Sequence, residues 1–296
     1  MTEPNSKFEK VLLIINPKSR RGLPVGHKLK KWILNNTDLK VTERHTDYAG
    51  HAHDIIRDAH VDDKTVIISV SGDGGMHECN QGVLHHNTHK EPVIVPWPGG
   101  NACDVFHSLY TKKSWKKALI KGRSRRIDFI EVTISGPENT QKYIAQQASV
   151  GLVAEAANIF HKNRPLNDFK ETWLVFLSYL TNKPVLIEIG GKKEKTANLI
   201  VTNIPRVGKY LKYPQCKPDD TYFVMTNTKG NRINLGLEII KAMTIGLKGK
   251  LLRELEFFMP EGGIMQIDGE PRRVPINSKV EIKVLPHYLK VLDWKT

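Results

Sequence analysis

The sequence predicts two domains: an N-terminal doubly wound, Rossmann-like α/β domain and a C-terminal antiparallel β-sandwich. In the first part of the 296-residue chain, four βα units follow one another at short spacing, which favours a mostly parallel sheet. From Ile127 onward, strand-like runs separated by turn residues dominate, a pattern typical of antiparallel sandwiches. We therefore expect domains over residues 1–128 and 129–296, with the last residues able to pack back on the first domain.

Apolar runs and amphipathic stretches define the elements expected in the first domain. The runs that predict buried strands are Lys10–Asn16, Leu39–His45, Val66–Val70 and Pro92–Pro96. Helices are expected around Leu29–Ile33, over Ala52–Ala59, from Met76 to about His86, and from near Asn101, after a loop over Pro96–Asn101. Polar turns thus follow several strands at their carboxyl ends, where open α/β sheets bind ligands.

The second domain is expected to consist mainly of strands. The predicted strands are Ile127–Ile134, Tyr143–Val150, Pro184–Ile189, Asn198–Asn203, Tyr222–Thr226, Leu251–Phe258, Ile264–Asp268 and Val280–Val284. Helices are expected over Ala154–Asn163, Glu171–Thr181 and Leu235–Leu247.

The stretch Thr65–Gly82 carries the strongest local signal. Its β-branched run ends at Ser71-Gly72-Asp73-Gly74-Gly75, and a helix with Glu78 in its first turn is expected to follow. A strand, a glycine turn and a helix aim backbone N–H groups at an anion, and glycines let a phosphate approach closely. An acid in such a cradle, here Asp73, is expected to hold a metal, orient a water or take a proton. The alternative is an ordinary turn in which Asp73 caps the helix. The spacing matches neither the Walker A loop nor the dinucleotide fingerprint.

Composition and charge limit the class of protein. A net charge of +14 and a pI of about 9.6 favour anionic partners such as nucleotides, nucleic acid or acidic lipid surfaces. The 3 widely spaced cysteines indicate neither a disulfide framework nor a zinc site. The start of the chain has no apolar signal segment and no apolar run is long enough to span a bilayer, so we expect a cytoplasmic protein. The basic stretch Lys112–Arg126 is either a solvated helix face or an electrostatic contact with membrane or nucleotide.

The 12 histidines show no metal-binding spacing. The clusters His51/His53 and His85/His86/His89 lack the i, i+4 pairing with a nearby acid that a zinc helix uses. We therefore expect surface histidines.

Several blocks resemble, in the correct order, the diacylglycerol kinase catalytic-domain superfamily. The stretch SGDGGMHECNQG resembles the family's GGDGT-x-x-E-x-x-x-G block, and its SGDG-x-MHE form is similar to that of sphingosine kinases. Asn16-Pro17-Lys18-Ser19 resembles the nucleotide loop N-P-x-S/A-G, although two arginines delay the glycine to Gly22. Thr46 stands at the threonine of T-x-x-x-G-x-A, Pro96–Asn101 resembles P-x-G-T-x-N, and Ile267–Pro271 resembles the late DGEP block.

The resemblance implies an ATP-binding α/β domain, a β-sandwich lid domain of the lipid-kinase and NAD-kinase type, and ATP and Mg²⁺ as cofactors. It assigns catalysis to Asp73 and Glu270, a structural Mg²⁺ to Asp220, and lipid contacts to Glu78 and Glu155, the latter facing the lipid amine in sphingosine kinases. The nucleotide-binding residues that it implies are Asn16, Pro17, Lys18, Ser19, Thr46, Ser71, Gly72, Gly74, Gly75, Gly99 and Asn101.

The chain also departs from the family pattern. Gly75 stands where threonine is usual, and Gly99 replaces a Ser or Thr whose hydroxyl would help hold phosphate. Pro98 replaces a glycine, and Asp220 lacks the glycine that normally follows it. Part of the grip on nucleotide and metal is therefore in question.

These observations lead to the hypothesis of an ATP-dependent lipid kinase whose substrate is diacylglycerol or a sphingoid-type lipid. Glu270, as in bacterial diacylglycerol kinases, or Asp73, as in sphingosine kinases, would take the proton from the lipid hydroxyl. The alternatives are an NAD kinase, which also carries GGDG, and a non-catalytic descendant that binds nucleotide or lipid. A transient contact with an anionic membrane surface is expected, nucleic acid is not because no motif for it is present, and a homodimer is left open.

Overall fold

The computed structural model describes residues 8–85, 91–163, 168–230 and 232–295. The chain divides into two compact units, one formed by Met1–Ile127 with His287–Thr296 and the other by Asp128–Pro286. The division falls inside two long strands, β5 (Ser124–Ser135) and β17 (Ser278–Leu292), so each of them contributes residues to both units.

A parallel sheet of 4 strands forms the first unit, in the order β2-β1-β3-β4. The strands are β1 (Lys10–Ile15), β2 (Lys40–His45), β3 (Thr65–Ser71) and β4 (Val93–Pro98). Every residue of β3 and β4 is buried, as expected for parallel strands covered on both faces. The predicted α/β fold class of the first domain is confirmed.

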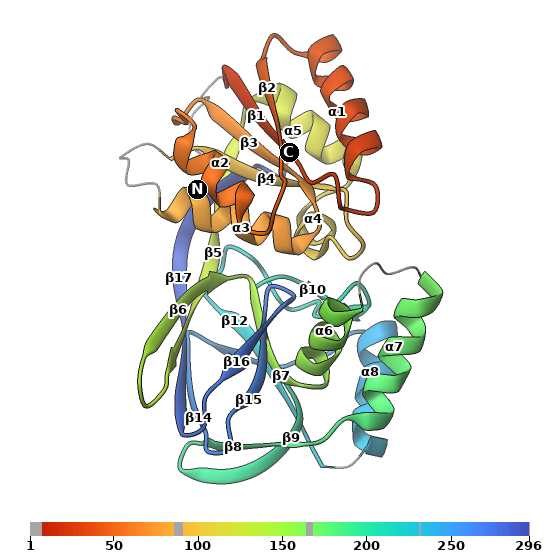
Figure 1. The fold of residues 1–296 in the computed structure, drawn as a ribbon, viewed down its shortest axis with the longest axis vertical. Helices are drawn as coiled ribbons and strands as arrows, with labels where there is room; N and C mark the ends of the chain where they lie inside the picture. The colour runs from red at the N-terminus through yellow and green to blue at the C-terminus, as the bar shows by residue number, and fades with distance from the viewer. Residues whose placement is uncertain (1–7, 86–90, 164–167, 231, 296) are drawn as a thin grey trace. The chain divides into compact units, whose positions relative to one another are not determined.

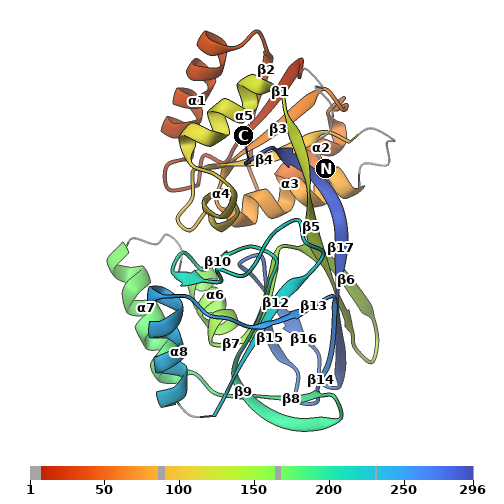
Figure 2. The same ribbon diagram turned by 180° about the vertical axis from the view of Figure 1, so that it is seen from behind.

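Helices cover both faces of this sheet. They are α1 (Gly22–Asn36), α2 (His51–Asp58), α3 (Asp73–His85), α4 (Asp104–Leu109) and α5 (Lys112–Lys121). The chain reverses its direction across the sheet after β2, so right-handed crossovers place α1 on one face and α2 on the other. Figures 1 and 2 show α2 beside α3 and α1 beside α5, where the Lys116 ammonium lies 4.4 Å from the centre of the Trp32 ring.

One antiparallel sheet of 11 strands forms the framework of the second unit. Its main path is β16-β15-β7-β9-β8-β14-β17-β5-β6, with β12 added at β9 and β13 at β12. Besides β5 and β17, the strands are β6 (Thr140–Ala145), β7 (Gln147–Gly151), β8 (Val185–Ile189), β9 (Lys192–Thr202), β12 (Phe223–Lys229), β13 (Lys250–Leu252), β14 (Glu254–Met259), β15 (Gly263–Ile267) and β16 (Glu270–Val274). A separate short pair joins β10 (Arg206–Val207) to β11 (Leu211–Lys212).

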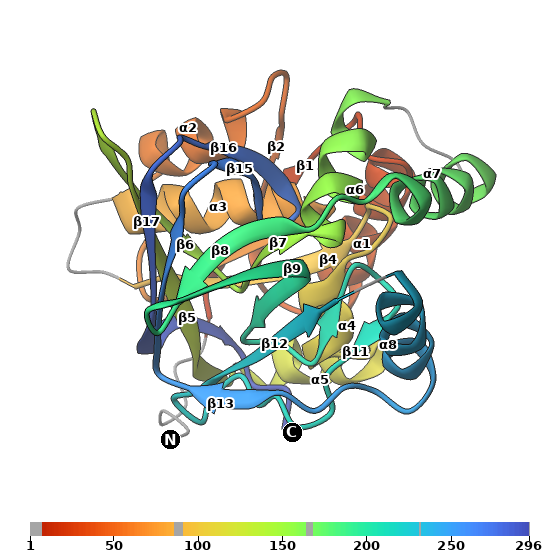
Figure 3. The ribbon, with the colours of Figure 1, turned by 90° about the horizontal axis from the view of Figure 1, so that it is seen from below.

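The sheet curls so that its inner face packs against itself (Figure 3). A single buried cluster contains side chains from strands far apart along the sheet, among them Ile134 of β5, Leu199 of β9 and Val274 of β16. Apolar residues that alternate along each strand can fill such a core in the same way as the facing sheets of a sandwich. The predicted fold class of this part is also confirmed.

Helices α6 (Leu152–Lys162), α7 (Asp168–Thr181) and α8 (Arg232–Thr244) pack outside this sheet. The Tyr179 hydroxyl of α7 donates a hydrogen bond to the Arg232 carbonyl at the start of α8 at 2.9 Å. Leu235 of α8 is buried together with Leu152 and Ala197, which fixes the helix pair to the sheet.

Several predicted boundaries were wrong for identifiable reasons. β4 continues to Pro98, where a loop was predicted, because β4 is an edge strand and an edge tolerates prolines that cannot donate to the ladder. The next helix starts at Asp104 instead of Asn101. The predicted strand Tyr143–Val150 is two strands that meet at Gln146, whose N–H leaves the ladder for the Asp268 carboxylate at 2.8 Å.

The aromatic core between α5 and β4 generates a stability prediction. Trp115 is fully buried, and its ring meets Trp97 edge-on with the centroids 4.8 Å apart. We expect Trp115→Ala to lower the free energy of unfolding of the first unit by about 3–5 kcal/mol, because it removes a large buried side chain and leaves a cavity. Chemical denaturation followed by circular dichroism measures this change. Leu34→Ala is the control: Leu34 is 53% exposed, and a comparable loss in that variant would contradict the assignment.

Candidate active site

The loops that follow the parallel strands leave the sheet at one edge. Ile15 pairs with both His45 and Val70, so β1, β2 and β3 end in register. The Thr46 N–H donates to the Ile15 carbonyl at 3.0 Å, and the Asn16 N–H donates to the Val70 carbonyl at 3.1 Å. The residues that begin the three loops are therefore held side by side by the backbone itself.

The loop after β1 is closed by its own polar groups. The Asn16 side-chain oxygen accepts a hydrogen bond from the Lys18 N–H at 2.9 Å, and the Asn16 carbonyl accepts from the Ser19 N–H at 3.1 Å. A Cβ added to Gly22 would lie 2.0 Å from the Asn16 carbonyl oxygen, so only glycine fits there. Glycine is therefore still required at position 22, although two arginines separate it from Ser19. The Lys18 ammonium donates to the Asp47 carbonyl at 2.9 Å, which ties this loop to the loop after β2.

Two glycine turns, after β3 and after β4, touch each other through their backbones. The N–H groups of Gly99 and Gly100 donate to the Ser71 carbonyl at 3.0 and 2.9 Å. A Cβ on Gly100 would lie 2.3 Å from the Gly72 Cα, and one on Gly99 would lie 3.2 Å from the Ser71 nitrogen. Contact between the turns therefore explains why these positions carry no side chain. Gly100 was not among the residues singled out from the sequence.

The glycine turn after β3 is shorter than predicted, because α3 begins at Asp73 and not at Met76. The Met76 N–H already donates to the Gly72 carbonyl at 3.2 Å, so Gly74 and Gly75 belong to the first helical turn. Backbone N–H groups in a first turn have no carbonyl partner within the helix and favour an anion. The Asp73 Oδ1 atom accepts from the Val105 N–H of α4 at 3.3 Å, which links the starts of two helices.

The loop after β4 also meets the loop after β1. The Arg21 N–H donates to the Gly99 carbonyl at 3.0 Å, and the Arg20 guanidinium donates to the Asn101 side-chain oxygen at 3.4 Å. The structure thus gathers the sequence-predicted nucleotide residues at one edge of the sheet, on loops, at the end of β3 and in the first turn of α3; these are Asn16, Pro17, Lys18, Ser19, Thr46, Ser71, Gly72, Gly74, Gly75, Gly99 and Asn101. Glu78 lies further along α3 and is half-buried.

The cysteines near this edge are not nucleophiles. Burial raises the pKa of the Cys79 thiol and that of the Cys103 thiol to about 12. The Cys103 thiol donates to the Ser71 carbonyl at 3.6 Å, so it adds to the contacts that hold the glycine turn.

The acids of the late DGEP block lie in the second unit and have different surroundings. Asp268 is buried, and its Oδ1 atom accepts from the N–H groups of Gln146 and Gln147 at 2.8 and 3.0 Å, so its role is structural. Glu270 is half-buried at the start of β16, and one of its carboxylate oxygens lies 3.6 Å from the His161 Nδ1 atom of α6. Glu155 lies in the first turn of the same helix. His161 carried no signal in the sequence.

Asp220 is accompanied by a second acid that the sequence did not single out. Burial raises the pKa of the Asp220 carboxyl, and the negative charge of Asp128 raises it further. Asp128 is fully buried, and its Oδ2 atom accepts from the Thr221 N–H at 2.6 Å. Thr221 has a φ of 66°, the left-handed region that favours glycine. The backbone shape that a glycine after Asp220 would supply is therefore present with a threonine.

Comparison with known families decides what kind of domain the first unit contains. Residues 10–132 match the family model described as the diacylglycerol kinase catalytic domain. This part of the chain is therefore similar to the diacylglycerol kinase catalytic domain. The resemblance read from the motifs is thereby confirmed. A search of curated proteins finds no match to the chain.

Solved structures share the fold over nearly the full length. A protein assigned as a diacylglycerol kinase from Bacillus anthracis str. Sterne is 21% identical, with a TM-score of 0.72 over 97% of this chain and 99% of its own. A further structure described as a diacylglycerol kinase from the same organism is 19% identical, with a TM-score of 0.68 over 97% of this chain and 98% of its own. At these identities the likeness concerns the fold alone. It extends beyond residues 10–132, which match the family model, into the second unit.

This chain has glycine at position 75, where the family motif has threonine, and another side chain fills the space next to it. A Cβ on Gly75 would lie 2.4 Å from the Ser71 Oγ atom and 2.6 Å from the Ser71 Cβ atom. The Ser71 hydroxyl donates to the Gly72 carbonyl at 2.9 Å and lies 2.7 Å from the Ser69 hydroxyl. A hydroxyl therefore occupies the space where a side chain at position 75 would begin, although it comes from Ser71.

This arrangement predicts that positions 71 and 75 are energetically coupled. We expect Gly75→Thr alone to destabilise the domain by about 1–3 kcal/mol, because the new side chain overlaps Ser71. The double variant Ser71→Gly/Gly75→Thr is expected to lose less free energy of unfolding than the sum of the two single variants, because the overlap is removed. Denaturation of the four proteins of this cycle measures the coupling.

Ser69→Ala provides the matched control for this cycle. The Ser69 Oγ atom would lie 3.9 Å from a Cβ at position 75, so removing it makes no room for threonine. Ser69→Ala should therefore couple to Gly75→Thr less strongly than Ser71→Gly does. Equal coupling in both cycles would rule out the steric explanation.

Proposed function

We propose that this protein is an ATP-dependent kinase that transfers the γ-phosphate to the hydroxyl of a lipid, either diacylglycerol or a sphingoid-type lipid. The observation that carries the proposal is the start of α3 at the loop edge of a diacylglycerol kinase catalytic domain. There a first turn rich in glycine, which favours a phosphate, also carries a carboxylate, Asp73. Phosphoryl transfer requires both a site that binds the phosphates and a group that binds a cation or accepts a proton.

The N–H groups at Gly74 and Gly75 would bind phosphate oxygens of ATP, and Asp73 would orient the cation that accompanies them. Mg²⁺ supplies neutralisation of the charge on the transferred phosphate. A second, structural Mg²⁺ suits the pair Asp220 and Asp128, because a cation would offset the repulsion and desolvation that raise the pKa of Asp220.

Glu270 is our first choice for the group that accepts the proton of the lipid hydroxyl. Its carboxylate keeps some exposure and has the His161 imidazole 3.6 Å away, whereas Asp268 is held by backbone N–H groups. Asp73 remains the alternative base. It already accepts a hydrogen bond from the Val105 N–H, which suits an orienting role better than proton transfer.

Exposed apolar side chains on α7 and α8 support a lipid as the acceptor. Phe169, Trp173 and Phe176 follow helical spacing on α7 and are 82%, 56% and 50% exposed. Ile233, Leu237 and Ile240 repeat that spacing on α8 and are 69%, 62% and 62% exposed. Apolar surface on two adjacent helices is unusual for a face that meets only water and is typical of surfaces that meet membranes or other proteins.

We propose an anionic membrane as the partner of this surface. Exposed lysines accompany it, among them Lys183, Lys241 and Lys248, and the chain has a net charge of +14. Exposed apolar side chains on a strongly basic chain suit an interfacial contact with acidic lipids. Among the described residues no helix is long and apolar enough to cross a membrane. We propose a peripheral contact.

The first test of the activity uses Asp73→Asn. We expect the wild-type protein to transfer radiolabelled γ-phosphate from ATP to one lipid of a mixed-micelle panel, and the variant to lose about 100-fold or more of that rate, as when one preorganised polar group is removed from a reacting centre. Asparagine keeps an oxygen for the Val105 N–H, so circular dichroism should show an intact fold.

The controls separate the remaining possibilities. Asp63→Asn makes the same change at an exposed aspartate and should leave the rate unchanged. Glu270→Gln tests the second acid and should cost about 10²–10⁴-fold if it is the base. Labelled NAD instead of lipid would identify an NAD kinase, and ATP binding without any labelled product would identify a non-catalytic protein.

A separate prediction concerns the membrane surface. We expect Leu237→Glu/Ile240→Glu to abolish binding to vesicles of phosphatidylcholine with phosphatidylserine, because two exposed apolar contacts become charges of the same sign as the lipid. Co-sedimentation with the vesicles measures this. Leu34→Glu on α1, at a position 53% exposed, should bind normally. Vesicle binding that ignores both variants and the lipid charge would contradict the assignment.

A further inference from the structure

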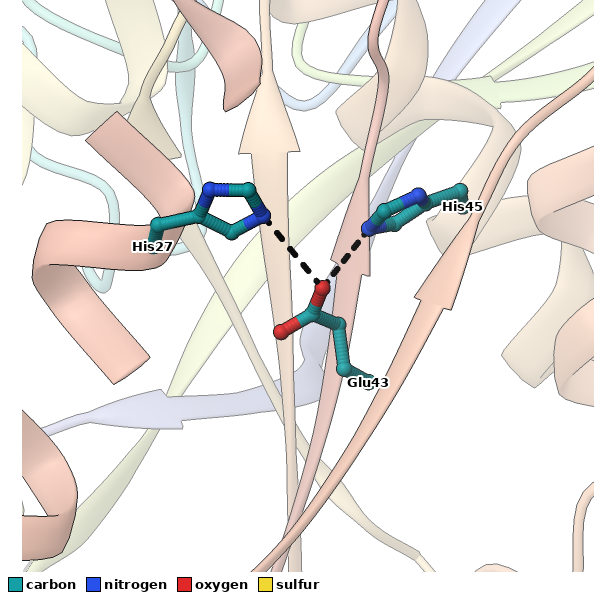
Figure 4. A group of neighbouring side chains, drawn as sticks. All are labelled: His27, Glu43 and His45. Atoms are coloured by element: carbon teal, nitrogen blue, oxygen red, sulfur yellow. Dashed lines mark hydrogen bonds and ion pairs between the residues drawn. The ribbon is translucent and has the colours of Figure 1, made fainter. Parts of the chain in front are cut away.

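A cluster of metal-ligating side chains lies on the first unit where α1 faces the edge strand β2. Glu43 and His45 are two residues apart on β2, so the strand directs both side chains to the same face. His27 belongs to α1 and completes the group (Figure 4). The three residues come from two elements, and nothing in the spacing of the histidines along the chain indicated them.

The ligand atoms of these residues converge on a volume that suits a small cation. The His45 Nε2 atom lies 2.7 Å from the Glu43 Oε1 atom, and the His27 Nε2 atom lies 3.6 Å from that same oxygen. One such atom from each residue lies within 4.8 Å of the others. Metal–ligand distances of about 2.0–2.2 Å in a tetrahedral site separate neighbouring ligand atoms by roughly 3.3–3.5 Å, so small rotations of the side chains bring the group to that geometry.

The two oxygens of the Glu43 carboxylate, at the centre of the cluster, have different surroundings. The side chain of Glu43 is 17% exposed, and its Oε2 atom is buried without a hydrogen bond, although the Lys30 ammonium lies 3.1 Å away. Burial alone would raise the pKa of Glu43, but the interactions with Lys30 and His45 outweigh it and lower that pKa. A deprotonated carboxylate beside two imidazoles is the donor set that zinc and similar ions prefer.

We propose that His27, Glu43 and His45 form a binding site for a divalent transition-metal ion, with Zn²⁺ as the best fit. The two imidazoles and the carboxylate supply three ligands, and water completes the coordination, because the side chains of His27 and His45 are 59% and 41% exposed. The bound ion fastens α1 to the edge strand β2. His45 directly precedes Thr46, a predicted nucleotide-binding residue, but the cluster shares no residue with the proposed phosphate-binding turn and does not depend on the proposed kinase activity.

The test uses the full chain, freed of metal with a chelator and titrated with Zn²⁺ by calorimetry and with Co²⁺ by visible absorption. We expect one tight equivalent whose Co²⁺ spectrum shows nitrogen and oxygen ligands. His27→Gln and His45→Gln should each weaken this equivalent by about 10- to 100-fold or more, since changes even in outer partners of a metal reach that range. The melting temperature should rise more with Zn²⁺ in the wild type than in these two variants.

Two further variants make the result specific. His60→Gln removes an exposed histidine outside the cluster and should leave the tight equivalent unchanged. Lys30→Met should strengthen binding by up to about fivefold, because it removes a cation that competes for Glu43, an effect the size of one exposed charge pair.

Several outcomes would overturn the proposal. Binding that is equally lost in His60→Gln, or unchanged in both His27→Gln and His45→Gln, would show that the metal binds elsewhere. No tight equivalent in a folded wild-type protein would show that the cluster is only a network of ion pairs.

Discussion

The close approach of two backbones, at Gly72 and Gly100, is the constraint on which the candidate active site depends. With a Cβ at Gly100 the nearest atom of Gly72 would be only 2.3 Å away, so neither turn could keep its course with a side chain there. The contact fixes the turn after β3 against the turn after β4, and the Arg21 N–H then attaches the loop after β1 to Gly99. The first turn of α3 is thereby held at the sheet edge without help from a ligand. Such preorganisation lets an anion bind without the cost of ordering the loops.

The same packing explains why a motif can lose side chains and keep its shape. Space at the start of α3 is shared between positions 71 and 75, so a hydroxyl at one of them excludes a larger side chain at the other. In the motif alone, Gly75 looks like the loss of a threonine side chain. In the structure, the Ser71 side chain occupies the space that a side chain at position 75 would need. Thr221 is a similar case, because it keeps a φ of 66° where glycine is usual after Asp220.

Periodicity predicted the layers of the fold because burial repeats along the chain. The uniformly buried β3 and the apolar stripe of α2 were visible in the sequence for this reason. The start of α3 could not be predicted, because glycines at a helix start resemble glycines in a turn. The predicted end of β4 was too early, because proline, here Pro96 and Pro98, is rare in strands. Partners from distant elements, such as His161 beside Glu270 or Asp128 beside Asp220, depend on tertiary contacts that no local pattern encodes.

The acids of the second unit show how burial divides similar residues into different tasks. Asp268 and Asp128 are almost fully buried. Asp268 accepts hydrogen bonds from two backbone N–H groups and Asp128 accepts one, so both carboxylates hold neighbouring loops together. Glu270, two residues after Asp268, is partly exposed. Asp220, which precedes the Thr221 that Asp128 binds, is also partly exposed. A carboxylate can exchange protons or bind a cation only if water or a ligand can reach it. Each buried acid therefore fixes the backbone close to a more accessible acid, so that water or a ligand can reach the carboxylates of Glu270 and Asp220.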